Sequence, residues 1–557
     1  MSFYENNMNQ IKLGFPELYE ILLTIDEPKV RQDFMQMEYM ETNAVQGATL
    51  VQKRDGEWMR LQSAYDPLLE ASIWMDGQEK PDKANLLVFG LGNGNYAHEV
   101  VARKSCNSKV VIYEPSPQLF FFVLHHYDLR EFFSMPGVRV IVDEVNDYMY
   151  SNVMEEMLNY ETFEEHAAYV APYMPELFPA QTKKFIEAYH DGVGRLMSNK
   201  NTTRRFIHST PHNILHNLKY LNDSLCVPDL AKVWNKDVPI LIVGAGPSLK
   251  EEVEILRTAS ERAYLFAVDS AMPFLLSRNI LPDAMICIES DKPMWVFADE
   301  RCKEVPLFCH MTTTSKLLDQ HQTKKIFGYD DGFIETLYHR LEIPCSTYRY
   351  GGNGATSFFA IARELGAKTV VLVGQDMCYD ENQQSHAGKR NEGFLQDDKF
   401  LCENNLGQTV QSRQDWYRFV RWYENAIPVC KFENVINTAM KGVKLSGTKV
   451  MSLKDALDTY GCEHEPLEKT LEKARASMDR ERNFDVKAFY EECLKEWEKL
   501  NEVISRDKRA EERKELLLYQ ILELYEIADK HEDFEKSQAE GLRLIKQYIE
   551  TELQSLS

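Results

Sequence analysis

A glycine turn follows an apolar segment near the middle of the chain, where residues 241–250 read LIVGAGPSLK. Gly244 and Gly246 can take positive φ and let another backbone approach closely. Pro247 suits the first turn of a helix, where its missing N–H costs nothing, and Ser248 adds a hydroxyl beside backbone N–H groups. A strand that passes through such a turn into a helix is typical of an anion-binding site. An ordinary tight strand-to-helix turn has the same pattern, so the turn alone leaves both interpretations open.

Polar side chains follow three further apolar segments of the same region. They are Asp269 and Ser270 in AVDSA, Glu289 and Asp291 in CIESD, and Gln375 and Asp376 in VLVGQD. Ligands of open α/β sheets bind at the carboxyl ends of the strands, so these residues predict a binding site at one edge of a sheet. Glu289 and Asp291 could hold a metal ion through oxygen ligands. Two carboxylates on a loop are usually only solvated, and we expect no metal.

The positions of these residues require a parallel sheet. The central region alternates apolar segments with helix-like ones, as in PILIVGAGPSL, AYLFAVDSAMPFLLSRN and GNGATSFFAIARELGAKTVVLVGQD. An earlier region repeats the alternation in LLVFGLGNGN, KVVIYEP and VRVIVDEVND. This pattern predicts an α/β fold with tandem Rossmann-like domains and parallel sheets.

The last part of the chain has a different texture. Residues 467–557 contain no proline and one glycine, and their apolar residues recur at three- and four-residue spacing, which predicts amphipathic helices. We therefore expect four parts: an N-terminal Rossmann-like α/β domain (1–195), a helical connector (196–236), a central Rossmann-like domain (237–455) and a C-terminal α-helical domain (456–557).

Composition limits the classes of function. Apolar residues make up 44% of the 557-residue chain, which argues against wholesale disorder. The net charge of −23 repels nucleic acid and anionic membranes. No apolar run is long enough to span a bilayer, and MSFYENNMNQIKLGF is not a secretory signal. With eleven scattered cysteines and no CxxC pair, we expect a cytoplasmic protein with reduced thiols, no membrane span and no nucleic-acid partner.

Two other motifs suggest chemistry. GLGNGN at 90–95, with Glu114 about 20 residues further on, has the order of a dinucleotide or methyltransferase fingerprint, and we interpret it as structural. Histidines recur every four residues in FIHSTPHNILHN, a spacing that can bind zinc. Pro211 interrupts that segment and no carboxylate accompanies it, so we interpret its histidines as structural: His208, His212 and His216.

The motifs of the central region together resemble the motility-associated factor (Maf) family of flagellin glycosyltransferases. LIVGAGPSLK, AVDSAMPFLLSRNILPDAMICIESD, GGNGATSFFAIARELGAKTVVLVGQD and SHAGKRNE carry the resemblance, with SAYDPLLEA and GLGNGN upstream and NTAMKGVKLSGTK downstream. The central region is also similar to bacterial sialyltransferases. The resemblance implies transfer of a nonulosonic acid, such as pseudaminic or legionaminic acid, from a CMP-sugar to Ser/Thr of flagellin. It implies no further cofactor.

Together with the strand-end residues, the resemblance predicts a donor-nucleotide site made of Gly244, Gly246, Pro247, Ser248, Asp269, Ser270, Glu289, Gly352, Asn353, Gly354, Thr356 and Gln375. His386 is the expected base, since imidazole titrates near neutrality, although the polar run DENQQSHAGKRNEG also fits a solvated loop. Asp376 would orient His386 or contact the donor, and Tyr379 would donate to the leaving phosphate. The candidate donors to the carboxylate of the sugar are Lys292, Lys389 and Arg390.

Three alternatives remain at this stage. The central region also resembles archaeal hydroxymethylpterin pyrophosphokinases, which would use ATP and Mg²⁺ with Asp269, Asp291 and Asp376 as ligands. The large flanking regions disfavour that reaction, because a small pterin needs no such platform. A methyltransferase that uses the first glycine turn and a non-catalytic flagellin-binding scaffold are the other two.

Overall fold

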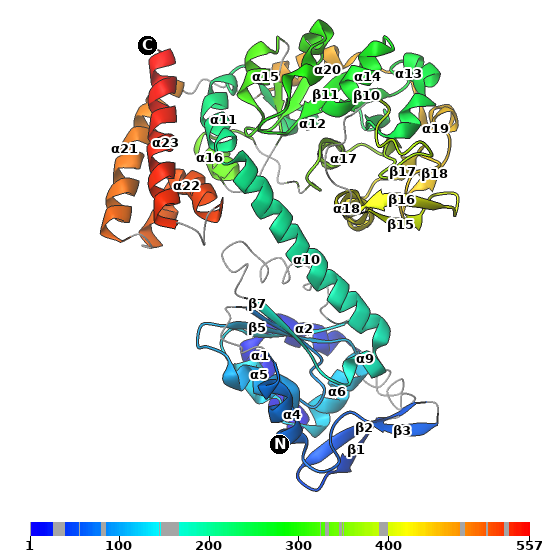
Figure 1. Cartoon of the computed structure of the whole chain (residues 1–557), viewed down its shortest axis with the longest axis vertical. Coiled ribbons are helices and arrows are strands. Elements are labelled where there is room, and N and C mark those ends of the chain that lie inside the picture. The colour runs from blue at the N-terminus through cyan, green and yellow to red at the C-terminus, as the bar shows by residue number, and fades with distance from the viewer. Residues whose placement is uncertain are drawn as a thin grey trace. The chain divides into compact units, whose positions relative to one another are not determined.

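The computed structural model describes residues 2–25, 39–54, 56–78, 85–143, 145, 166–322, 325–328, 333–344, 348, 350–388, 399–478, 485–507, 511–528 and 534–556. The chain divides into two compact units, Met1–Thr202 and Thr203–Ser557 (Figure 1). The 28-residue helix α10, Pro179–Phe206, begins in the first unit and ends in the second. The finer division into four parts stays a prediction.

The first unit is built on a four-stranded parallel sheet in the order β6-β5-β4-β7. Its strands are β4 (Asn85–Phe89), β5 (Lys109–Glu114), β6 (Val138–Val142) and β7 (His166–Val170). A separate antiparallel sheet holds β1 (Tyr39–Asn43), β2 (Ala48–Arg54) and β3 (Glu57–Arg60). The helices are α1 (Phe3–Gly14), α2 (Pro16–Thr24), α4 (Pro67–Asp76), α5 (Asn95–Arg103), α6 (Pro117–His126), α7 (Arg130–Ser134) and α9 (Met174–Leu177).

The second unit contains a nine-stranded parallel sheet in the order β18-β17-β14-β9-β10-β11-β12-β13-β8. The strands are β8 (Leu225–Cys226), β9 (Ile240–Val243), β10 (Tyr264–Val268), β11 (Ala284–Cys287), β12 (Leu307–Cys309), β13 (Lys325–Phe327), β14 (Thr369–Val373), β17 (Asn434–Asn437) and β18 (Lys449–Val450). An antiparallel hairpin, β15 (Lys399–Glu403) and β16 (Thr409–Arg413), stands apart from it. The central strands are buried on both faces, as parallel strands covered by helices must be.

Helices connect and cover the strands of this sheet (Figure 1). They are α11 (Ser209–Asn217), α12 (Val227–Ala231), α13 (Val253–Ala259), α14 (Met272–Ser277), α15 (Ser315–Gln320), α16 (Phe333–Arg340), α17 (Gly354–Glu364), α18 (Gln414–Cys430) and α19 (Leu453–Tyr460). Helix α17 packs on β9, β10 and β11 and is buried almost all round, which explains its run of Phe and Ala.

The C-terminal helices are α20 (Leu467–Ala476), α21 (Val486–Arg506), α22 (Leu517–Ala528) and α23 (Phe534–Ser555). Their buried residues, such as Tyr490, Ile521 and Ile545, belong to the same hydrophobic core as the nine-stranded sheet. In the part of the chain that the structure describes, no helix is both long and apolar enough to cross a membrane. The predicted fold, with parallel α/β sheets followed by helices, is confirmed.

Candidate active site

The strand order of the second unit reverses between β9 and β14. Strands β10 to β13 follow one another on one side of β9, and the chain then returns to place β14 on the other side of β9. Ligands of open α/β sheets bind in the crevice at such a switch point, outside the carboxyl ends of the strands. The glycine turn after β9 and the sequence Gly374-Gln375-Asp376 after β14 both lie there.

The two glycines of the turn are required by close contact with the end of β14. The N–H of Gly244 donates to Val373 O at 2.8 Å, and the N–H of Gly246 donates to Gly374 O at 2.9 Å. A Cβ at either glycine would lie 2.7 or 2.6 Å from Gly374 O. Neither glycine has a positive φ, so the reason for glycine here is space for a neighbouring backbone and not left-handed geometry. Pro247 then begins a short 3₁₀ helix that ends at Lys250, as its position in the sequence suggested.

Asp376 is hydrogen-bonded to the glycine turn after β9, which we expected to bind phosphate. Its carboxylate accepts from Ser248 Oγ at 2.8 Å and from the Ser248 N–H at 3.2 Å. Asp376 is 5% exposed, and this burial raises its pKa to about 6, although both bonds from Ser248 oppose the rise. The turn therefore already binds one anion. A phosphate at the turn must share Ser248 with Asp376 or bind when Asp376 is protonated.

Two buried amide groups lie at the carboxyl ends of neighbouring strands. Gln375 follows β14, and its Nε2 is buried with no hydrogen-bond acceptor among the described residues. Asn437 ends β17, which pairs with β14, and its Nδ2 is also buried without an acceptor in the described structure. An unmet buried donor costs about 1–3 kcal/mol, so an oxygen-rich ligand would be stabilised here. Asn437 was missed in the sequence because the segment around it has no strongly apolar run.

The loop that carries His386 is fastened to the glycine turn. The N–H of Ala387 donates to Ala245 O at 2.8 Å, and Lys250 donates to Gln384 Oε1 at 2.6 Å. Asp380 shapes the loop from within, because its carboxylate accepts from two backbone N–H groups between 2.8 and 2.9 Å. The structure thus brings the half-buried His386 to the β9 side of the switch point, and its role as a base stays a prediction.

His386 Nδ1 lies 2.7 Å from Ser385 Oγ. If Nδ1 carries the ring proton and donates to Ser385, Nε2 is the unprotonated nitrogen, which is the one that takes a proton from a hydroxyl. The carboxylate of Asp376 faces Ser248, so the predicted role of Asp376 in orienting His386 stays a prediction.

Tyr379 packs beneath the β15–β16 hairpin. It is 5% exposed, its ring lies 4.9 Å from that of Trp416, and Lys399 Nζ lies 4.1 Å from its ring centroid. Arg413 lies 4.0 Å from the Trp416 ring centroid and pairs with Asp415 at 2.6 Å. The hairpin therefore places two cations near Tyr379, a feature that the sequence analysis missed because these residues lie more than 15 positions further along the chain.

Asp269 and Glu289, after β10 and β11, share a lysine. Lys292 Nζ lies 3.0 Å from Asp269 Oδ1 and 2.8 Å from Glu289 Oε1. Burial raises the pKa of Asp269, and Lys292 offsets part of that rise. Burial opposes the charge of Lys292, but the two carboxylates outweigh it and raise the lysine pKa. Lys292 is thus committed to these carboxylates, while the half-buried Ser270 and the partly exposed Glu289 line the edge of the group.

The predicted donor loop forms the start of α17. Gly352 has φ +91°, and Asn353 caps the helix through a 2.8 Å bond from the Thr356 N–H. Gly354 packs against side chains of β10 and β11, so the N-terminus of α17 points toward the strand ends that carry Asp269. The partial positive charge of this helix end favours an anion. Lys389 and Arg390 lie outside the described residues.

A buried polar cluster at the end of β12 was also missed. His310 is 1% exposed, and its Nε2 lies 3.2 Å from Tyr348 Oη and 3.3 Å from Ser357 Oγ of α17. The available signal was a histidine directly after the apolar segment PLFC, the same pattern that marked Asp269.

The glycine turn of the first unit lies at the corresponding switch point, between β4 and β7. Glu114 is fully buried there and accepts from the N–H groups of Leu91 and Gly92, both at 3.0 Å. The side chains of Tyr173 and Met174, after β7, close against Gly92 and Gly90. Glu114 therefore bonds to the turn itself, as a structural role requires.

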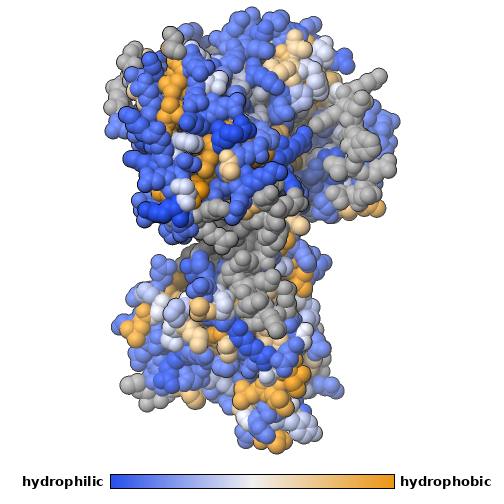
Figure 2. All heavy atoms as spheres, turned by 60° about the vertical axis from the view of Figure 1, so that its left-hand side comes forward, coloured by the Kyte–Doolittle hydropathy of each residue, from blue (hydrophilic) through white to orange (hydrophobic). Residues whose placement is uncertain are grey.

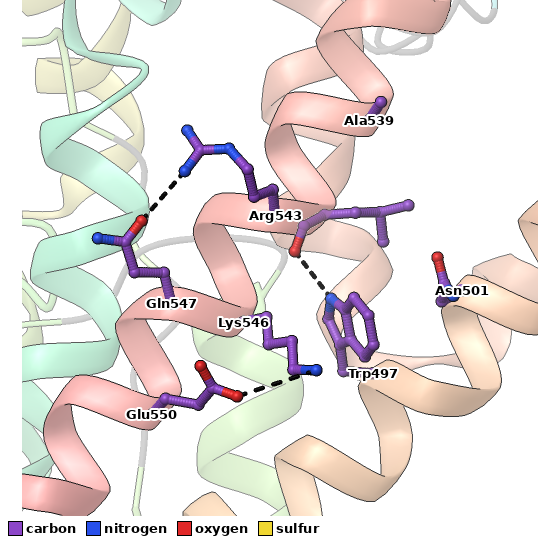
Figure 3. A pocket seen from close by; sticks show the side chains of 8 residues that line it. Trp497, Asn501, Ala539, Arg543, Lys546, Gln547 and Glu550 are labelled. Atoms are coloured by element: carbon purple, nitrogen blue, oxygen red, sulfur yellow. Dashed lines mark hydrogen bonds and ion pairs between the residues drawn. The ribbon is translucent and has the colours of Figure 1, made fainter.

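A surface pocket of about 510 Å³ lies elsewhere, between α21 and α23 (Figure 3). Lys546 covers the Trp497 ring at 4.6 Å, and Trp497 Nε1 donates to Leu542 O at 2.8 Å. All eight lining residues belong to these two helices, and none lies at the carboxyl edge of the sheet.

A family model matches part of the second unit. Residues 212–382 match the family model described as "6-hydroxymethylpterin diphosphokinase MptE-like". An uncharacterized protein of Treponema pallidum (strain Nichols) is 28% identical over 112 residues, which is 20% of this chain and 52% of that protein. The match thus spans about half the length of this curated relative.

A solved structure extends the likeness to the whole chain. The Maf glycosyltransferase from Magnetospirillum magneticum AMB-1 superposes with a TM-score of 0.54 at 15% identity, covering 99% of this chain and 95% of that one. The resemblance to a Maf glycosyltransferase that the sequence motifs indicated is confirmed at the level of the fold.

Proposed function

We propose that this protein is a glycosyltransferase that moves a nonulosonic acid from a CMP-sugar to Ser/Thr hydroxyls of flagellin. The observation that carries the proposal is the fold likeness to a Maf glycosyltransferase over 99% of the chain, which includes both units and the terminal helices. The polar switch point between β9 and β14 supports it, since a nucleotide-sugar presents many acceptor oxygens to donors such as Gln375 Nε2.

In the proposed reaction, the donor lies across the carboxyl ends of β14, β9 and β10. The bond between the anomeric carbon and the phosphate oxygen breaks, and the phosphate leaves with the bonding electrons. Ser248, Gln375 and the start of α17 stabilise this negative charge. His386 Nε2 takes the proton of the acceptor hydroxyl as the new glycosidic bond forms.

The first unit carries a surface suited to a protein acceptor. Exposed apolar side chains gather on α4 and the adjoining loops, and apolar patches are visible on this unit in Figure 2. We call this set the α4 patch: Val45, Tyr65, Leu68, Leu69 and Ile73, each more than half exposed. Apolar patches of this kind mark interaction surfaces. We infer that flagellin binds there.

The decisive test is intact-mass analysis of flagellin co-expressed with this protein in a cell that makes a nonulosonic acid. We expect a mass increase in multiples of that sugar, lost in His386→Ala. Unmodified flagellin beside folded, soluble protein would reject the transfer.

Thermal shift then separates the alternatives, because a ligand raises Tm only if it binds the folded protein. We expect stabilisation by CMP. Stabilisation by ATP and Mg²⁺ alone would favour the diphosphotransferase, and stabilisation by S-adenosylmethionine alone would favour the methyltransferase. In the described structure two of the three diphosphotransferase carboxylates already have partners, since Asp269 pairs with Lys292 and Asp376 accepts from Ser248.

The α4 patch has its own test. Leu69→Asp and Ile73→Asp change exposed side chains, so both variants should fold. We expect them to weaken flagellin capture while CMP binding is unchanged, whereas Leu13→Asp on α1, 79% exposed, should change neither. Equal capture by all three variants would exclude the patch. Point substitutions are preferable to deleting 467–557, because those helices share the core of the second unit.

A further inference from the structure

Two histidines and a carboxylate meet where α11 contacts the last helix of the chain. His212 and His216 stand four residues apart on α11, so both lie on one face of the helix. Glu552 comes from α23, which packs against α11 (Figure 1). One ligand atom from each of these three residues lies within 4.8 Å of the other two.

The sequence argued against a metal at these histidines for two reasons, and the fold removes both. Pro211 falls in the first turn of α11, where proline is tolerated, so the helix is continuous over both histidines. The missing carboxylate is supplied from 336 residues further along the chain, with Glu552 Oε1 2.7 Å from His216 Nδ1.

We propose that His212, His216 and Glu552 bind a zinc ion. Imidazole nitrogens and a carboxylate oxygen are ligands that zinc prefers, whereas magnesium and calcium select oxygen. Ligand atoms around a tetrahedral zinc lie about 3.4 Å apart for bonds of about 2.0–2.1 Å. Small side-chain movements reach that geometry, and water completes the fourth position.

The surroundings fit a metal-bound imidazole. His216 Nε2 lies 3.0 Å from Asp319 Oδ1, so the ring can donate to Asp319 while Nδ1 faces the metal. This carboxylate–histidine arrangement orients metal ligands in many sites. Lys219 Nζ lies 2.8 Å from His216 Nε2 and 3.3 Å from Asp319 Oδ1, on the outer side of the ring.

The ring of His212 makes weaker polar contacts than the ring of His216. Its centroid lies 5.5 Å from that of His216 and 5.2 Å from that of Tyr548, and its Nδ1 is 3.5 Å from Asn213 Oδ1, which is too long for a strong hydrogen bond. A metal would give this half-buried imidazole a strong partner.

Zinc here would fix a helix that supports the active-site edge. Asn213 of α11 donates to Ser290 O at 2.8 Å and to Thr312 O at 3.0 Å, in the loops that follow β11 and β12. Ser290 is the neighbour of Glu289. The ion would join α23 to α11 and so hold these loops, without contact with the substrate.

The full chain is first stripped of metal with EDTA and dialysed, and calorimetry then measures the binding of added ZnCl₂. Elemental analysis counts the zinc that stays bound after the excess ion is removed. We expect one zinc per chain and a rise in Tm on adding ZnCl₂. His212→Ala and Glu552→Gln should each weaken zinc binding at least about tenfold, and Asp319→Asn should weaken it by about 10–100-fold, as for other groups that orient a ligand.

His208→Ala is the matched control, because His208 is exposed on the same segment and is not one of the three ligands. It should keep full zinc binding. Without zinc, His212→Ala should lower Tm only by the loss of its ring contacts with His216 and Tyr548, since it breaks no ion pair. The proposal fails if the wild type takes up no zinc at micromolar concentration. It also fails if His212→Ala and Glu552→Gln bind zinc as well as His208→Ala does, which would leave an ion-pair cluster or a site elsewhere.

Discussion

Each of the two parallel sheets has a glycine turn at the point where its strand order reverses, and the two turns differ in what fills them. In the first unit, Gly90 and Gly92 have positive φ and lie against Met174 and Tyr173. In the second unit, the turn after β9 has no positive φ and lies against the polar sequence Gly374-Gln375-Asp376. Large side chains therefore pack against the glycine turn of the first unit, whereas hydrogen-bonding groups border the glycine turn of the second unit.

Both turns also bind a buried carboxylate, and burial raises the pKa of each: to about 7 for Glu114 and about 6 for Asp376. Backbone N–H groups hold Glu114, whereas the Ser248 hydroxyl, which can rotate to another acceptor, holds Asp376 in part. A strand–glycine–helix turn is thus a way to bury an acid in a parallel sheet. It becomes a candidate ligand site only where donors such as Gln375 Nε2 remain unmet.

The largest contrast should come from removing a histidine near each turn. His386→Ala should lower the rate of sugar transfer by about 10²–10⁴-fold with little change in donor affinity, because a general base acts on the chemical step. His98→Ala, on α5 directly after the first turn, removes an exposed pair with Glu131 and should leave the rate unchanged. Transfer kinetics with purified flagellin measure both. Full activity in His386→Ala would return His386 to the solvated-loop interpretation.

Alanine at one glycine of each turn should separate binding from stability. In Gly246→Ala the new Cβ meets Gly374 O and Asp376, so we expect donor affinity to fall by about tenfold or more, which is about 1.4 kcal/mol. In Gly90→Ala the φ of +102° and the contact with Met174 should cost about 1–3 kcal/mol of folding stability with donor binding intact.

Calorimetry and denaturant unfolding of both variants supply the two measurements. The comparison breaks down if Gly246→Ala binds CMP normally, or if Gly90→Ala weakens CMP binding in protein that is still folded.

The two carboxylates also make the comparison testable by pH. As pH falls through about 6, Asp376 gains a proton, loses its charge and releases the Ser248 N–H. The single phosphodiester charge of a CMP-sugar does not change in this range. We therefore expect donor affinity to rise as pH falls from about 7 to about 5, by at most about tenfold per pH unit.

Asp376→Asn should bind the donor with no such pH dependence. A wild-type affinity that is flat over this range, or an unchanged slope in Asp376→Asn, would show that Asp376 does not compete with the donor phosphate.

The raised pKa of Glu114 should affect folding stability and not donor affinity. The folded state holds its proton more tightly than the unfolded chain, so stability falls as pH rises from about 4.5 to about 7 and is level above that. The change is about 3 kcal/mol in size. Glu114→Gln should flatten this slope in denaturant unfolding of the first unit while leaving donor affinity unchanged. A slope that persists would assign it to other groups.

Sequence patterns predicted the strands that are continuous apolar runs, such as Tyr264–Val268 and Thr369–Val373, because a parallel strand buried on both faces has no polar side. They missed β7 and β17, whose segments are short and mixed, and with β17 they missed Asn437. Strand-end positions could be predicted from the runs alone.

The pairings at the site could not be predicted in this way. Asp376 and Ser248 lie 128 residues apart and meet only because β14 returns to the side of β9. Glu552 and His216 are separated further still. Such contacts depend on strand order and helix packing, which local periodicity does not encode.

The last prediction has the smallest expected effect: no cofactor should bind at the glycine turn of the first unit. The GLGNGN motif with Glu114 has the order of an S-adenosylmethionine or dinucleotide site, in which the acidic residue bonds to ribose hydroxyls. Here that carboxylate accepts from Leu91 N–H and Gly92 N–H, and Tyr173 stands against the turn. A cofactor would have to displace bonds within the turn and move large buried side chains. Calorimetry of the full chain with S-adenosylmethionine and with NAD should therefore give no binding heat, while CMP gives heat under the same conditions. Micromolar binding of either cofactor that Glu114→Gln abolishes would overturn the structural interpretation of this turn. Binding that survives Glu114→Gln would place the cofactor elsewhere and leave the contrast between the two turns intact.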